Sequence, residues 1–209
     1  VNINLIQENE NELINLHGNT LQTRISPPPS FQRINHQNGT FSEYLRQLPM
    51  KPHNSEVRLY DGSTKKNHNI YDAVVDLEIG NRNLHQCADA IMRLRAEYLW
   101  ENKLYDKIHF NFTNGFRVDY SEWMKGRRII VNGNSTQWTT NPINEASNTY
   151  NNFWKYMQII FNYAGTLSLS QELQTIDINN MNIGDIFIQG GSPGHAVIVV
   201  DVAENSVTE

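Results

Sequence analysis

Cys87 is the only cysteine in the chain, and it lies in the segment Asn83–Ala90, whose pattern indicates the start of a helix. Far downstream, the glycine-rich segment Gly190–Gly194 leads into His195 and the apolar stretch Ala196–Val200. A helix N-terminus favours a thiolate because its free N–H groups carry partial positive charge. An imidazole beside the sulfur also favours the thiolate and can protonate a leaving group. The two residues therefore predict a cysteine nucleophile with a histidine base.

Both residues also have a purely structural interpretation. Free cysteines are commonly small buried residues in helices, and a histidine can simply begin a strand. Because Cys87 and His195 lie far apart in the sequence, only the fold can bring them together. Two hypotheses therefore stand side by side: a cysteine hydrolase of peptidase or amidase type, and a binding module in which Cys87 is structural.

The helix predicted over Gln86–Asn102 has to position the sulfur. Its apolar residues recur every three or four positions and so form one face. These are Ala90, Ile91, Leu94, Tyr98 and Leu99. Cys87 falls in the first turn on this face, so we expect it to be partly buried while its sulfur emerges at the helix end.

The histidine is expected on a hairpin of two antiparallel strands, Asp185–Ile188 and Ala196–Val202, joined by the glycine-rich segment. Other elements follow from periodicity and turn residues. We expect helices over Ser42–Leu48 and Asn148–Tyr163, a short turn of helix at Leu167–Leu173, and strands over Val57–Tyr60 and Ile108–Phe112. The period of the apolar stretch Tyr71–Ile79 is ambiguous, and a strand is one interpretation of it. Helices packed on one side of an antiparallel sheet define an α+β fold.

We expect one domain at residues 31–209, preceded by a polar arm and Pro-rich linker at residues 1–30. Within the domain, residues 116–147 have the pattern of an irregular insertion that carries one strand, Arg128–Val131. The sequence stops where a partner strand should start, so we expect the last strand or strands of the fold to lie beyond this chain.

The composition excludes several function classes. The net charge is −5 and no basic stripe occurs, which excludes a nonspecific nucleic-acid binder. We expect no transmembrane segment, because no apolar run reaches about 18 residues. The start at Val1 lacks the features of a signal peptide, although a chain that begins with valine can already be processed. We expect no cofactor.

The hairpin resembles that of the NlpC-type papain-like peptidases and amidases. In that family a Gly-Asp turn, here Gly184-Asp185, leads into a strand, and a Gly-His pair, here Gly194-His195, opens the next. The family's Asp-Cys-Ser-Gly is replaced here by Gln86-Cys87-Ala88-Asp89. The resemblance implies a papain-like fold, with a helix carrying the cysteine packed on a sheet carrying the histidine. It also implies a peptide or peptidoglycan-like substrate.

A second resemblance covers nearly everything from about Leu45 onward, and its motifs are similar to the bacterial domain-of-unknown-function family 4846. They are Leu48–Pro52, Tyr60–Gly62, Gln86–Ala90, Met92–Leu99, Phe112–Phe116, Tyr163–Thr166 and Pro193–Val197. This resemblance implies an extracytoplasmic setting: periplasm, cell envelope or secreted. It supplies no activity.

A catalytic triad needs a third residue that orients the imidazole. Asp201 shares the strand face of His195 by period two, but six residues place it roughly 20 Å away. Asn205 and Glu209 are no better placed. We therefore expect the orienting residue beyond Glu209. For the oxyanion hole, the backbone N–H of Cys87 would act with the side chain of Gln86 or Asn83.

A metal site is the rival chemistry, because His85 and Cys87 form a His-x-Cys pair, and His109 and His195 would bring the number of ligands to four. The second close pair typical of structural zinc is missing, so we expect no metal. Trp123 and Trp138 have two interpretations: core residues, or the lining of a cleft for sugar or peptide. Asp89 is expected to be a solvated or capping residue.

Overall fold

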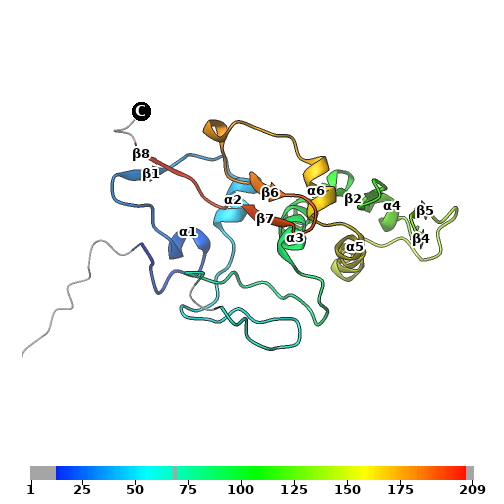
Figure 1. The fold of residues 1–209 in the computed structure, drawn as a ribbon, viewed down its shortest axis with the longest axis horizontal. Helices are drawn as coiled ribbons and strands as arrows, with labels where there is room; N and C mark the ends of the chain where they lie inside the picture. The colour runs from blue at the N-terminus through cyan, green and yellow to red at the C-terminus, as the bar shows by residue number, and fades with distance from the viewer. Residues whose placement is uncertain (1–12, 68–69, 206–209) are drawn as a thin grey trace, which may run out of the picture. The chain divides into compact units, whose positions relative to one another are not determined.

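The computed structural model describes residues 13–67 and 70–205, so residues 1–12 of the predicted arm and Glu209 lie outside the described ranges. The described residues form a mixed α+β structure of short helices and two-stranded antiparallel sheets (Figure 1). They divide into two compact units, Val1–Glu78 with Val200–Glu209, and Ile79–Val199. Within the described ranges, no helix is both long enough and apolar enough to cross a lipid bilayer.

The first unit contains α1 (Leu21–Arg24), β1 (Phe31–Arg33), α2 (Phe41–Arg46) and β8 (Ala203–Asn205). Strands β1 and β8 pair antiparallel. Asp201 joins this unit through two charged hydrogen bonds, from Nε of Arg33 at 2.6 Å and from Nε of the buried Arg46 at 2.7 Å. The helix predicted over Ser42–Leu48 is confirmed, but it ends at Arg46.

Two predicted strands of this unit do not form. At Val57–Tyr60 the described residues contain only a single bridge, between Arg58 and Thr64. Asp61 accepts hydrogen bonds from both the N–H and the hydroxyl of Ser63, in the turn between the two bridged residues. The stretch Tyr71–Ile79 likewise forms one bridge, from Val75 to Met50, within the described residues.

The second unit begins with the predicted cysteine helix, α3 (Cys87–Glu101). Its N-terminus is closed by Asp89, whose Oδ2 accepts a hydrogen bond from the backbone N–H of Gln86 at 2.9 Å. The predicted apolar face is confirmed only in part, because Ile91, Leu94 and Leu99 are buried whereas Ala90 and Tyr98 are half-buried. The residues that this helix contributes to the core cluster are Ala88, Ile91, Met92, Ala96 and Leu99.

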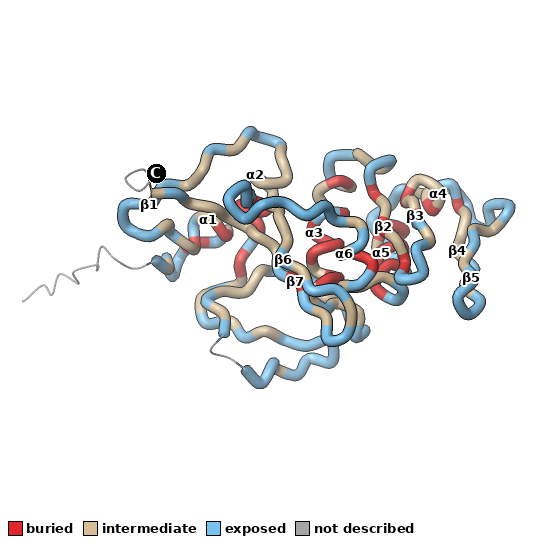
Figure 2. The backbone as a smooth tube through the Cα atoms, turned by 45° about the horizontal axis from the view of Figure 1, so that its top comes forward, coloured by how far each residue is buried: buried red, intermediate tan, exposed pale blue. Residues whose placement is uncertain are grey.

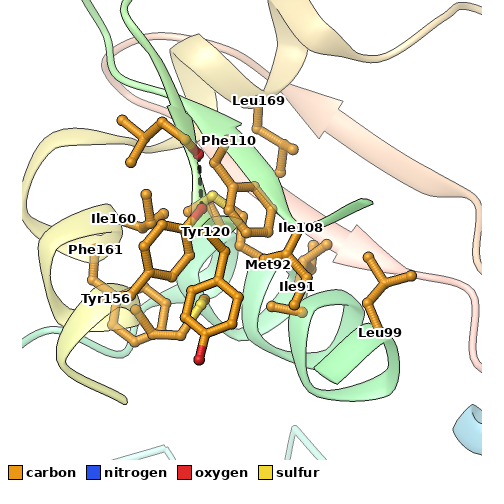
Figure 3. Close-up of a cluster of buried hydrophobic side chains, with 14 of the residues drawn as sticks. Ile91, Met92, Leu99, Ile108, Phe110, Tyr120, Tyr156, Ile160, Phe161 and Leu169 are labelled. Carbon is orange, nitrogen blue, oxygen red and sulfur yellow. Dashed lines mark hydrogen bonds between the residues drawn. The ribbon is translucent and has the colours of Figure 1, made fainter. Parts of the chain in front are cut away.

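The other long helix is α5 (Tyr150–Tyr163), where Thr149 Oγ1 accepts the N–H of Asn152. Its inner face is fully buried: Phe153, Tyr156, Met157 and Ile160. Figure 3 shows this face meeting α3 in one apolar cluster, in which the Tyr156 hydroxyl donates to the carbonyl oxygen of Val118 at 2.8 Å. Figure 2 shows buried residues concentrated on these helices.

Residues 116–147 are more regular than the sequence indicates. The 3-10 helix η1 (Tyr105–Lys107) precedes strand β2 (His109–Asn111), which pairs with β3 (Arg117–Asp119). Helix α4 (Tyr120–Met124) follows directly after β3. Strand β4 (Ile129–Asn132) then pairs with β5 (Ser135–Trp138). The predicted strand at Arg128–Val131 is confirmed as β4. The difference arises because Val118, Tyr120 and Trp123 are buried in the same core as α3 and α5, and this packing orders short elements of weak local pattern.

The unit ends with α6 (Thr166–Glu172), the 3-10 helix η2 (Ile178–Asn180), β6 (Ile186–Gln189) and β7 (His195–Ile198). The predicted hairpin is confirmed, with Gln189 opposite His195, but β7 ends four residues before the predicted Val202. Helix α3 packs against β7 and α6 against β6 (Figure 1). The histidine strand therefore lies in a two-stranded sheet rather than in a larger one.

Candidate functional site

Cys87 is the first residue of α3 and is a free, half-buried thiol. The next residue, Ala88, is buried in the core, so the helix is fixed directly behind the sulfur. The predicted placement, partly buried and at the helix end, is confirmed. The unpaired N–H groups of a helix's first turn carry partial positive charge, which favours an anion at this position.

Asp89 lies two residues further along the same turn. Its side chain caps the helix, as predicted, but it is not solvated: the residue is 7% exposed. Burial raises the pKa of Asp89 to about 6, and the hydrogen bond from the Gln86 N–H opposes this rise. The first turn of α3 therefore carries both the thiol and a buried carboxyl group.

An open groove of about 320 Å³ lies at Cys87. It is lined from α3 and the residues before it, from the start of α6, and from the loop between β6 and β7. The lining residues on these segments include Asn83, Gln86, Cys87, Asp89, Gly165, Thr166, Gly191 and Gly194. The predicted oxyanion residues Gln86 and Asn83 both line this groove, and both are exposed.

The loop between β6 and β7 is held against α6 by close backbone contacts. A Cβ atom at Gly194 would overlap both Oγ1 of Thr166 and the carbonyl oxygen of Gly191, and one at Gly190 would overlap Oγ of Ser170. Thr166 also donates a hydrogen bond from Oγ1 to the Gly191 carbonyl at 3.3 Å. Only glycine allows the loop to lie this close to the helix, and this approach places it at the groove.

His195 is exposed and follows this loop as the first residue of β7. Ala196 is buried in the core, so the alternation of a strand puts His195 on the other face, with the exposed Val197. The groove lining contains Gly194 but not His195. Among the described residues, no hydrogen bond joins the sulfur to the imidazole. The structure thus brings the predicted loop to Cys87, with His195 at its edge.

The two tryptophans predicted as possible cleft residues lie elsewhere. Trp123 is only 5% exposed, and its indole N–H donates to the backbone and side-chain oxygens of Asn152, both at 3.1 Å. Of its two interpretations, the structure selects the core. Trp138 is half-buried on β5 beside Phe116, and Arg127 lies over its ring. Neither ring lines the groove at Cys87.

His85 precedes the cysteine but is held by apolar packing. Its ring meets Phe161 edge to face, with 5.9 Å between the centroids. Burial lowers the pKa of His85 to about 4, and the positive charge of Arg93 adds to this effect. Within residues 13–67 and 70–205, no three histidine, cysteine, aspartate or glutamate side chains are grouped so that they could hold a metal ion.

Asp201 is not placed on the strand of His195, because β7 ends at Ile198. Its carboxylate is instead bonded to Arg33 and Arg46 in the first unit. The prediction that Asp201 and His195 share a strand face is therefore wrong. The expectation that Asp201 does not orient the imidazole is consistent with these ion pairs. Glu209 lies outside the described residues.

Sequence reasoning missed the contribution of α6. Gly165 and Thr166 line the groove opposite α3, and the Gly165 N–H donates to Ser168 Oγ at 3.0 Å. A signal was present in the sequence, since Gly165-Thr166-Leu167-Ser168 has a serine three residues after a candidate N-cap. This pattern predicts that a helix starts here, but it does not predict that the start of the helix lies at the Cys87 groove.

In a comparison with protein families, residues 21–209 match the family model described as "Domain of unknown function (4846)". No curated protein matches the chain, and no solved structure matches it.

Proposed function

The chain belongs to domain-of-unknown-function family 4846, and we propose that it is a cysteine hydrolase of the peptidase or amidase type. Cys87 is the nucleophile and His195 the general base and acid. The observation that carries the proposal is the groove itself. Its lining includes the chain's only cysteine, at a helix N-terminus, and glycines of the loop that leads into the histidine.

The proposed reaction has two halves. The Cys87 thiolate attacks the amide carbonyl, the C–N bond breaks, and the imidazolium of His195 gives its proton to the leaving amine. A water molecule, deprotonated by the imidazole, then hydrolyses the thioester and restores the thiol. The Cys87 N–H and the amide of Gln86 or Asn83 donate to the developing oxyanion.

The position of His195 decides whether this reaction is possible. In the proposal, its exposed ring turns over the edge of the groove when a substrate is bound. Gly194 supports this step, since the residue between the groove and the histidine carries no side chain in the way. Catalytic hydrogen bonds are commonly long in unliganded enzymes and tighten only with substrate.

The proposal extends to fold and location. Helix α3 with Cys87 at its head and its packing against the His195 strand support a papain-like arrangement of the NlpC type. We propose a peptide or peptidoglycan-like amide as substrate and an extracytoplasmic setting. Their support is the resemblance of the Gly184-Asp185 and Gly194-His195 hairpin to that of the NlpC family.

A second candidate function has a specific observation in its favour. His195 is exposed and does not line the groove. A binding module would need no imidazole at the sulfur, and the neutral polar lining by Asn83, Gln86 and Thr166 would suffice to hold a ligand.

Thiol reactivity separates the two candidates. Alkylation by iodoacetamide is followed by mass spectrometry at pH 6, and every label reports Cys87 because the chain has no other cysteine. A hydrolase requires fast labelling that falls at least about tenfold in His195→Ala. His17→Ala, which removes an exposed histidine of the other unit, is the matched control and should change nothing. Slow labelling, equal in wild type and His195→Ala, would contradict the hydrolase and favour the binding module instead.

A further inference from the structure

A second groove lies in the Ile79–Val199 unit and has the composition of a ligand site. None of its lining residues lines the groove at Cys87. It measures about 500 Å³ and lies between the β2–β3 turn, the β4–β5 hairpin and the end of α5. This volume is within the range of small-molecule sites. Its main lining residues are Thr113, Asn114, Val131, Asn134, Thr136 and Tyr163.

The lining contains no charged side chain. It combines an aromatic ring with amides and hydroxyls. Tyr163 is 41% exposed, and its ring packs against Phe112, which is fully buried and also borders the groove, with 5.0 Å between the ring centroids. A supported aromatic ring that is open to the groove can stack against an apolar ligand face.

The polar groups are held in place by bonds between the segments. The side-chain amide of Asn114 donates to the carbonyl oxygen of Asn134 at 2.9 Å and to Oγ1 of Thr136 at 2.8 Å. The Oδ1 atom of Asn114 accepts the N–H of Phe116, so this side chain is fixed on both sides. Asn114 thereby ties the β2–β3 turn to the β4–β5 hairpin and makes the groove a built feature.

Other polar groups at the groove remain available. In the described residues, the side-chain amide of Asn134 and the hydroxyl of Tyr163 make no hydrogen bond within the protein. An amide supplies two donors and an acceptor, and a phenol supplies one donor and acceptor. A ligand here meets an aromatic surface beside neutral groups that can both donate and accept.

We propose that this groove binds a neutral saccharide. A pyranose ring has an apolar C–H face and a rim of hydroxyls, which match the Tyr163 ring and the Asn134 and Thr136 groups. The absence of charge in the lining disfavours sugar acids and phosphates, whose desolvation nothing there would offset. This inference is independent of the proposed hydrolase activity.

NMR titration of the full chain with cellotriose, N,N′,N″-triacetylchitotriose and trigalacturonate tests the proposal. We expect at least one neutral trisaccharide to cause saturable shifts of the Asn114, Asn134 and Thr136 amides, and trigalacturonate to bind more weakly. Absence of saturable shifts with both neutral sugars would overturn the proposal. Tighter binding of trigalacturonate than of the neutral sugars would also overturn the proposal. Displacement of the sugar by phenol at equal concentration would overturn it as well.

Variants locate the binding. Tyr163→Ala should weaken it about tenfold and Asn134→Ala about threefold. Tyr60→Ala removes a tyrosine of equal 41% exposure in the other unit and should have no effect. If Tyr163→Ala and Asn134→Ala both bind the sugar as tightly as the wild type, the proposed site is refuted. Because Tyr163 also packs on Phe112, thermal melts check that Tyr163→Ala is folded. If Tyr163→Ala unfolds, the test rests on Asn134→Ala, which alters only an exposed side chain. Cys87→Ser should bind sugar normally, so failure here is distinct from failure of the hydrolase proposal.

Discussion

The α-carbon of Gly194 lies so close to Thr166 that a single added methyl group at position 194 would overlap the threonine side chain. Gly194 immediately precedes His195, and Thr166 is the first residue of α6. This contact fixes the histidine loop to the helix that forms the far side of the Cys87 groove. It makes the geometry of the candidate site dependent on one glycine.

Gly194→Ala should therefore lower the free energy of unfolding by about 2 kcal/mol or more, measured by urea denaturation. The Thr166 side chain can rotate away, but the second overlap is with the carbonyl oxygen of Gly191, which belongs to the backbone and cannot. Gly165→Ala is the matched control on the same groove. A Cβ atom there meets nothing within 4 Å, so we expect a change within about 0.5 kcal/mol. Equal stability of the two variants would show that the loop is not held as described.

Asp89→Asn should stabilise the protein above pH 6. The folded pKa of about 6 lies above the reference 3.8, mainly because the carboxyl is buried. The folded state therefore binds more protons between about pH 4 and 6, and the free energy of unfolding falls as pH rises through this window. Asparagine keeps an acceptor for the Gln86 N–H without the buried charge. We expect a gain on the order of 1–2 kcal/mol at pH 7 that shrinks toward pH 4.

Urea denaturation at pH 4, 5, 6 and 7 checks this difference. Asp177→Asn is the control, because Asp177 caps the exposed 3-10 helix η2 by accepting the N–H of Asn179. Its substitution should show no gain at pH 7. A loss of stability in Asp89→Asn at pH 7 would mean that the carboxylate form of Asp89 is stabilised, contrary to its burial.

His85 should act in the opposite direction over nearly the same window. Burial, with the charge of Arg93, holds its folded pKa at about 4, below the reference 6.5. The unfolded state binds more protons between about pH 4 and 6.5, so stability is lost as pH falls. His85→Leu should reduce this loss, and its stability relative to wild type should improve steadily from pH 7 to pH 4. His17→Leu, at an exposed position, should show no such trend.

Tyr156→Phe tests the polar contact inside the core. The buried Tyr156 hydroxyl donates to the Val118 carbonyl oxygen at 2.8 Å. Removing it leaves the carbonyl without this donor, so the free energy of unfolding should fall by about 1–2 kcal/mol in thermal or urea unfolding. Tyr60→Phe removes an exposed hydroxyl and should be neutral. If both variants are equally stable, another donor, such as an internal water, satisfies the carbonyl.

Local signals account for what could be predicted. The spacing of apolar residues and a capping position located α3 to within a residue at each end, and the glycine-rich segment located the β6–β7 hairpin. These signals lie within a few residues of the element they define. The strands expected at Val57–Tyr60 and Tyr71–Ile79 failed because β-branched composition does not by itself supply a pairing partner.

The sequence by itself determined that Cys87 heads a helix and that His195 opens a strand after a glycine loop. Only the tertiary structure decided that the start of α6 lines the groove, that Asp89 is buried, and that the His195 ring lies on the face of β7 opposite the core. The physical reason is the distance along the sequence between the residues that interact. Helix and turn formation depend on neighbours a few residues away, whereas burial and approach depend on segments such as Thr166 and Gly194, which only the packed core brings into contact.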